Sequence, residues 1–116
     1  MDRTSKQLRK MIGDWSAIAH DRELVKALRE LRGEFDRWER GEIDPIELSD
    51  RIHKFHQGPA RDLWVRYTTN PLDPQVAYAV ATGILSKDEI PAELLQHLTN
   101  WLNFYEGLQR ESEKDT

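Results

Sequence analysis

The segment Asp21–Arg40, DRELVKALRELRGEFDRWER, decides the fold class of this chain. Its large apolar residues recur at alternating steps of four and three positions, which places them along one side of an α-helix. This spacing is typical of helices that pack nearly side by side. We therefore expect residues 21–40 to form a long helix with one buried stripe: Leu24, Leu28, Leu31, Phe35 and Trp38.

A second apolar stripe precedes this segment and follows a different phase. Its members, again three or four positions apart, are Leu8, Met11, Trp15 and Ile18. The spacing does not continue from Ile18 to Leu24, so the two stripes do not share one helical face. We predict a break or kink near His20-Asp21, and one continuous helix over residues 5–40 is the alternative.

Strong start and stop signals follow residue 40. Gly41 favours the left-handed conformation that ends a helix, and Asp44 followed by Pro45 is typical of a helix start. We expect the next helix to stop at Gly58 and a further helix to begin at Pro59. Two more apolar patterns predict helices near residues 74–83 and 91–110.

These patterns together predict an all-α protein. We expect a compact bundle of five to six mostly antiparallel helices, because short connections favour antiparallel neighbours. The length of 116 residues fits a single domain, which we assign to residues 1–110. Residues 111–116 are polar, and we predict a frayed tail there.

Composition excludes several classes of function. The chain has no Cys, which rules out disulfides, thiolate metal sites and a cysteine nucleophile. No apolar run approaches the roughly 20 residues of a membrane span, and no secretory signal is recognisable. We therefore expect a cytoplasmic protein without a membrane partner. No segment carries the fingerprint of a characterised family.

Nucleic-acid binding is a weak alternative. The net charge of −4 lacks the basic bias that phosphate binding needs, although residues 51–66 are locally basic. Two helices joined by a turn at Gly58-Pro59 would resemble a helix-turn-helix reader of DNA. The overall acidity and the proline at the turn argue against that interpretation. The basic side chains concerned are Arg51, Lys54, Arg61 and Arg66.

Two ligand sites are conceivable in the middle of the chain. His53 and His56 lie one helical turn apart with Asp50 upstream, so a divalent metal could meet two imidazoles and a carboxylate. The pattern lacks the spacing of a zinc-protease helix, and a solvated polar face is the preferred explanation. Alternatively, a helix start after Gly58, with Arg61 and His56 beside it, could bind an anion. The structural alternative is that Gly58-Pro59 forms a tight turn and that Arg61 pairs with a neighbouring acidic side chain.

A protein-interaction role has broader support. Trp38 lies at the end of one apolar stripe, and Trp101, Tyr105 and Leu108 continue another past the length that neighbouring helices would cover. Trp and Tyr dominate binding hot spots, although burial in the monomer core is the competing explanation. We predict a non-enzymatic helical interaction protein that self-associates or binds another protein. No catalytic residue or cofactor is predicted. The alternatives are a metal- or anion-binding protein, with or without enzymatic activity, and a nucleic-acid-binding regulator.

Overall fold

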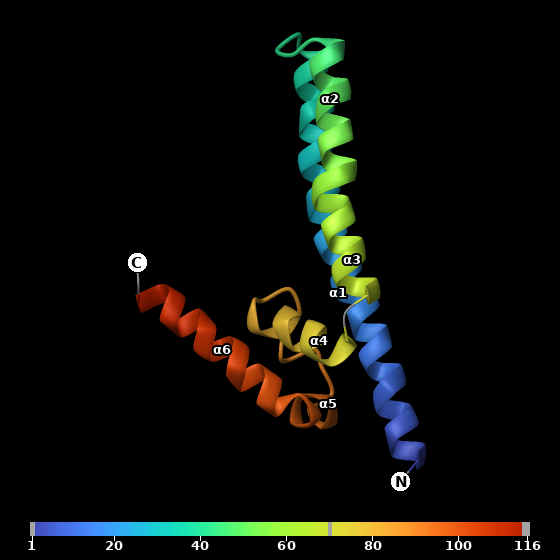
Figure 1. Cartoon of the computed structure of the whole chain (residues 1–116), viewed down its shortest axis with the longest axis vertical. Helices are drawn as coiled ribbons and strands as arrows, with labels where there is room; N and C mark the ends of the chain where they lie inside the picture. The colour runs from blue at the N-terminus through green and yellow to red at the C-terminus, as the bar shows by residue number, and fades with distance from the viewer. Residues whose placement is uncertain (1, 70, 115–116) are drawn as a thin grey trace. The chain divides into compact units, whose positions relative to one another are not determined.

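The computed structural model describes residues 2–69 and 71–114, and every regular element in them is helical (Figure 1). The all-α prediction is therefore confirmed. In chain order the elements are α1 (Asp2–Glu39), α2 (Pro45–Phe55), the π-helical turn η1 (His56–Ala60), α3 (Arg61–Thr69), α4 (Leu72–Ala81), α5 (Ala92–His97) and α6 (Thr99–Lys114).

Residue contacts divide the chain into two units. The hairpin unit is His20–Thr69, and the terminal unit comprises the described residues 2–19 and 71–114. The single domain over residues 1–110 stays a prediction. Each unit has its own internal contacts.

Helix α1 runs without interruption from Asp2 to Glu39. The predicted break near His20-Asp21 is wrong, and the continuous alternative is correct. The change of phase instead coincides with the boundary between the units, since Ala19 is the last residue of one and His20 the first of the other. A helix can bury different faces along its length without losing a backbone hydrogen bond. In the first half the buried residues lie one position after those predicted: Ile12, Ser16 and Ala19.

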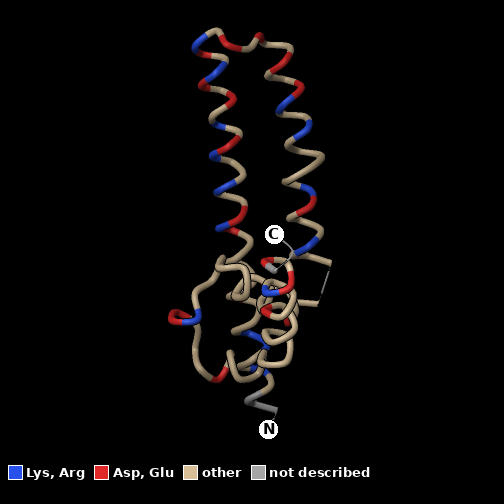
Figure 2. Tube along the Cα trace, turned by 90° about the vertical axis from the view of Figure 1, so that its left-hand side faces the viewer, with Lys and Arg blue, Asp and Glu red and all other residues tan. Residues whose placement is uncertain are grey.

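The turn between α1 and α2 forms as its residues dictate. Gly41 adopts a φ of 77° and its N–H donates to the Trp38 carbonyl. Asp44 caps α2, because its Oδ1 accepts a hydrogen bond of 2.7 Å from the Glu47 amide, and Pro45 takes the first helical position. Figure 2 shows the two arms that result, α1 from His20 onward and α2–η1–α3, running in opposite directions.

The corner predicted at Gly58-Pro59 does not exist. The chain passes from α2 to α3 through the π-helical turn η1, with Pro59 inside it. Leu48 and Tyr67 are both buried although they are 19 positions apart, which in a regular α-helix would separate their directions by about 100°. A π-turn holds about one extra residue, so it turns the later part of the arm back toward α1. Pro59 is accommodated because the wider turn relaxes the backbone that a proline would otherwise disrupt.

The terminal unit holds the largest fully buried side chains among the described residues: Val76, Leu85, Leu94 and Leu98. Helix α4 buries small residues, including Ala77 and Ala79, and packs against α6. The predicted helix 91–110 is interrupted at Leu98, between α5 and α6. Helix α6 extends to Lys114, and residues 115–116 lie outside the described part of the chain. The frayed tail over residues 111–116 stays a prediction.

Replacing Asp44 by alanine should lower the free energy of unfolding by about 1 kcal/mol, because the Glu47 amide loses its acceptor. Urea denaturation monitored by circular dichroism measures this change. Ser49→Ala, at an exposed interior position of the same helix, is the control and should change stability by less than about 0.5 kcal/mol. Equal effects of the two substitutions would contradict the assignment of the cap.

Leu98→Ala should cost about 2–5 kcal/mol, because Leu98 is fully buried and its removal leaves a cavity. Leu28→Ala should cost only about 1 kcal/mol in the monomer, because the Leu28 side chain is 46% exposed. Unfolding measured at low micromolar concentration, where association is minimal, separates the two values. Similar losses at both positions would mean that Leu28 is buried in the folded monomer.

Candidate functional site

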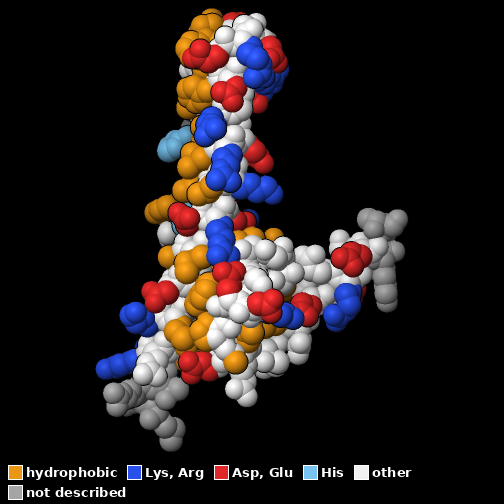
Figure 3. All heavy atoms as spheres, turned by 180° about the vertical axis from the view of Figure 1, so that it is seen from behind, with side chains coloured by type: hydrophobic (Ala, Val, Ile, Leu, Met, Phe, Trp, Pro, Cys, Tyr) orange, Lys and Arg blue, Asp and Glu red, His pale blue; other side chains and the backbone are white. Residues whose placement is uncertain are grey.

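The stripe that decides the fold class is only partly buried in the hairpin unit. Leu28, Phe35 and Trp38 of α1 remain 46%, 39% and 39% exposed. Ile52 of α2 and Trp64 of α3 add side chains that are 38% and 58% exposed. We call these five residues the apolar face. Figure 3 shows hydrophobic side chains following one another along one side of the hairpin.

The apolar face exists because the two arms meet along a neighbouring line of residues. Glu34 pairs with Arg51 of α2 at 2.8 Å, and the Glu23 carboxylate accepts a hydrogen bond of 2.5 Å from the Tyr67 hydroxyl of α3. Glu34 immediately precedes Phe35, so their side chains leave α1 about 100° apart. When α1 directs Glu34 toward the other arm, Phe35 is carried to the side.

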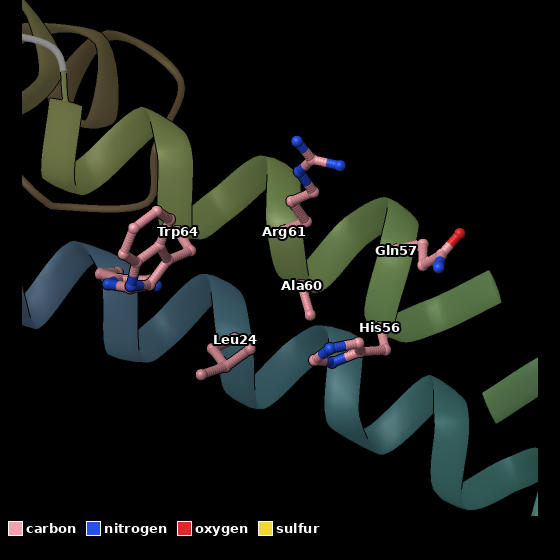
Figure 4. Close-up of a pocket in the computed structure, with 7 residues that line it drawn as sticks. Leu24, His56, Gln57, Ala60, Arg61 and Trp64 are labelled. Atoms are coloured by element: carbon pink, nitrogen blue, oxygen red, sulfur yellow. The ribbon is translucent and has the colours of Figure 1, made fainter. Parts of the chain in front are cut away.

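A groove of about 610 Å³ lies within the hairpin unit, at the end away from the α1–α2 turn. Its walls are His20, Leu24, His56, Gln57, Ala60, Arg61 and Trp64. In the close-up, His56 and Trp64 project toward α1 on either side of Ala60, whose methyl group is too short to fill the space between them (Figure 4). The groove is thus mainly apolar, with two imidazoles in its lining.

Tyr67 packs against His20, one of the residues that line this groove. Its ring stacks on His20 with centroids 4.9 Å apart and planes inclined by 10°. Its hydroxyl donates to Glu23, whose carboxylate also accepts from Arg66 at 3.3 Å. Burial, together with the hydrogen bond to the Glu23 carboxylate, raises the pKa of Tyr67 far above its ordinary value of 10.0. The cluster holds His20 in place as part of the groove wall.

The predicted metal ligands are not brought together. The Asp50 carboxylate forms an ion pair of 2.9 Å with Lys54, and that hydrogen bond lowers the pKa of Asp50. His53 and His56 are exposed on consecutive turns. Within residues 2–69 and 71–114 no group of three or more His, Asp or Glu side chains is placed to hold a metal ion. The spacing alone put these residues on one side of the helix but did not make them converge.

The predicted anion site also lacks its basis. It required a helix to begin after Gly58, but Gly58 lies inside η1 and its carbonyl accepts the Arg61 amide. Free amides at a helix start are what binds an anion there, and the backbone instead continues as a helix. The Arg61 side chain points away from α1 whereas His56 points toward it (Figure 4).

The helix-turn-helix interpretation of residues 51–66 is likewise wrong, because a π-turn replaces the corner that would separate its two helices. Most of the basic side chains are already paired with carboxylates: Arg51 with Glu34 and Glu47, Lys54 with Asp50, and Arg66 with Glu23. These pairs reduce the positive charge that a phosphate backbone would meet.

The four residues predicted to form an interaction surface fall in both units. Trp38 belongs to the hairpin unit. In the terminal unit, Trp101 and Leu108 of α6 are 43% and 47% exposed, whereas Tyr105 is half-buried and stacks on Trp101. Phe104 was not predicted as part of this surface, but it is 55% exposed and contacts both rings. Its spacing of three positions from Trp101 was the available signal.

The missed residues of the hairpin unit are more consequential. Leu28 and Phe35 were expected in a buried stripe, and the structure adds Ile52 and Trp64 to the apolar face. All four are substantially exposed. No sequence signal distinguishes a stripe that faces the partner arm from one that lies beside it, because the spacing is the same in both cases.

Comparison with protein-family models, curated proteins and solved structures found no match. The support for the apolar face and the groove as functional sites is therefore their geometry. Among the described helices, none combines the length and apolar character that crossing a bilayer requires.

Tyr67→Phe should destabilise the fold by about 0.5–1.5 kcal/mol at pH 7, through loss of the hydrogen bond to Glu23. A tyrosine with a raised pKa in the folded state stabilises the protein below the unfolded value of about 10, and this contribution is lost as the pH rises further. The wild type should therefore lose stability between pH 9 and 11 more steeply than the variant. Urea unfolding at these two pH values, with Tyr78→Phe as control, measures the difference. An equal decrease in the free energy of unfolding in wild type and Tyr67→Phe would contradict the hydrogen bond between Tyr67 and Glu23.

Proposed function

We propose that this protein is a non-enzymatic helical interaction protein that self-associates through the apolar face of its hairpin unit. The observation that carries the proposal is the row of five large apolar side chains, each between 38% and 58% exposed, along one side of two packed helices. Isolated exposed apolar residues are ordinary, but contiguous rows of them mark interaction sites.

The composition of the apolar face favours a protein partner. Two of its five residues are Trp and one is Phe, and such side chains contribute most of the binding energy at protein interfaces. The face lies on regular helices whose register is held by the ion pair between Glu34 and Arg51. A second helical surface could pack against it by the same interdigitation that joins the two arms.

The size of the face is in the range of a small dimer interface. At roughly 200 Å² for a complete side chain of this kind, the exposed fractions amount to about 440 Å² per copy. Two copies would bury on the order of 900 Å² from these side chains alone. The polar rim adds to this, and specific interfaces bury about 1,200–2,000 Å² in total.

The remaining expectations from sequence form part of the same proposal. They are a compact bundle of five to six mostly antiparallel helices as the scaffold, and the cytoplasm as the location. The exposed aromatic side chains of α6, Trp101 and Phe104, offer a further surface for a protein partner.

Phe35→Glu should weaken self-association at least tenfold, because association would bury the introduced charge without a partner. The monomer should remain folded, since Phe35 is already 39% exposed. Sedimentation velocity from low to high micromolar concentration measures the dissociation constant, and circular dichroism verifies helicity.

Val65→Glu is the matched control. Val65 is 40% exposed and lies about 200° around α3 from the buried Leu63, on the outer side of its arm. This substitution should leave the dissociation constant within about twofold of wild type. A wild-type protein that stays monomeric at high micromolar concentration would refute the proposal, as would equal losses in the two variants.

A further inference from the structure

The apolar face differs between its two arms, and this difference bears on how a second copy would lie against it. α1 contributes most of the projecting side chains, among them Leu28 at 46% exposure. The second arm supplies five of the seven residues that line the groove, with the small Ala60 between His56 and Trp64, and α1 supplies His20 and Leu24 (Figure 4). Leu28 of α1 thus projects, whereas the second arm has only the small Ala60 beside the groove, so a contact that joins these two places would be complementary in shape.

Contacts between the two arms fix which residues lie opposite one another along the hairpin. His20 stacks on Tyr67, and Glu34 pairs with Arg51 of the same hairpin. Residues of the two arms that lie at the same distance from the α1–α2 turn, which is called their height here, therefore have residue numbers whose sum is about 86. The groove between positions 56 and 64 is level with Leu24 and Leu28. If α1 of one copy lies over the second arm of another at equal height, Leu28 meets the groove.

Charged residues at the edge of the apolar face favour the same arrangement, with α1 of one copy over the second arm of the other. Asp21 precedes Leu28 and Phe35 by seven and fourteen positions, so it lies on their side of α1, and Arg61 lines the groove of the second arm. Both are exposed, and neither has an ion-pair partner within the described part of the chain. In this arrangement each Asp21 lies within about one helical turn of an Arg61 from the other copy.

The opposite arrangement lacks this complementarity. In that arrangement α1 of one copy would lie on α1 of the other, and the hairpin tips would lie at opposite ends. The two-fold axis would then run across the arms, and such an axis reverses the direction of the hairpin. Asp21 would then approach the other copy's Glu39, which lies on the same side of α1 eighteen positions later. Like charges at both ends of the contact disfavour it.

We propose that two copies pair as parallel hairpins with their tips at the same end, each α1 lying over the second arm of the other. Leu28 of each copy then occupies the groove beside Ala60 of the other, and Asp21 pairs with Arg61. This arrangement rests on the proposed self-association and specifies its partner, a second copy of this chain.

Charge reversal tests the pairing across the interface. Asp21→Arg and Arg61→Asp should each weaken association about tenfold at low salt, since every dimer contains two such pairs. The double variant should return to within about threefold of wild type. Asp62→Arg, an exposed neighbour of Arg61, is the control and should change the dissociation constant less than twofold. Loss in the double variant equal to the sum of the single losses would overturn the proposal.

Distance between the tips tests the direction of pairing independently. The chain has no Cys, so Ile46→Cys, at a position 83% exposed near the tip, gives a single site for a nitroxide label. Pulsed electron resonance on the dimer should give a separation below about 25 Å for parallel hairpins. Opposed hairpins would place the labels about 30 Å or more apart, because an arm of some twenty residues is about 30 Å long.

The two measurements separate failure of this arrangement from failure of self-association. A wild-type monomer at high micromolar concentration would refute both proposals. A wild-type dimer that Phe35→Glu dissociates, but whose labels lie far apart, would retain the proposed function and overturn the parallel arrangement.

Discussion

The hairpin unit depends on one constraint, which is that its two arms meet beside the apolar stripe of α1 rather than on it. The contact line contains Glu23 and Glu34, each fastened to the second arm by a hydrogen bond or ion pair. Because these residues fix the rotation of α1, the apolar residues next to them are turned to the side. An α-helix has one direction for each residue, so the arms cannot satisfy the polar contacts and bury the whole stripe at once. The exposed apolar face follows from that geometry.

The π-turn η1 serves the same constraint on the second arm. Without its extra residue, α3 would leave the turn rotated by about 100°, and Tyr67 could not reach Glu23 while Leu48 stayed buried. π-turns are uncommon and often occur at functional sites. Here the turn also supplies the wall of the groove, since His56 and Ala60 belong to it. The five residues of η1 thus both correct the rotation of the second arm and form part of the groove.

Much of the local structure could be predicted from the sequence, and the candidate site could not. The cap at Asp44, the turn at Gly41 and the helical character of every element depend on interactions within a few residues, which the sequence displays directly. Leu28 and Phe35 were placed on the correct stripe but assigned the wrong environment. Burial depends on which neighbour covers a side chain, and the spacing of a stripe carries no information about that neighbour. The histidines show the same limit, since one helical turn between them was insufficient to create a metal site.

The sequence by itself determined that this chain is helical, where its principal turn lies and which residues share a helical side. These properties follow from backbone hydrogen bonding and from the rotation of 100° per residue. Only the tertiary structure decided that α1 continues through His20, that Gly58-Pro59 forms a π-turn instead of a corner, and that Trp64 and Leu28 face outward. Each of these outcomes depends on contacts between residues distant in sequence. Such contacts fix how one helix is rotated against another, and that rotation selects the side chains left open to a partner.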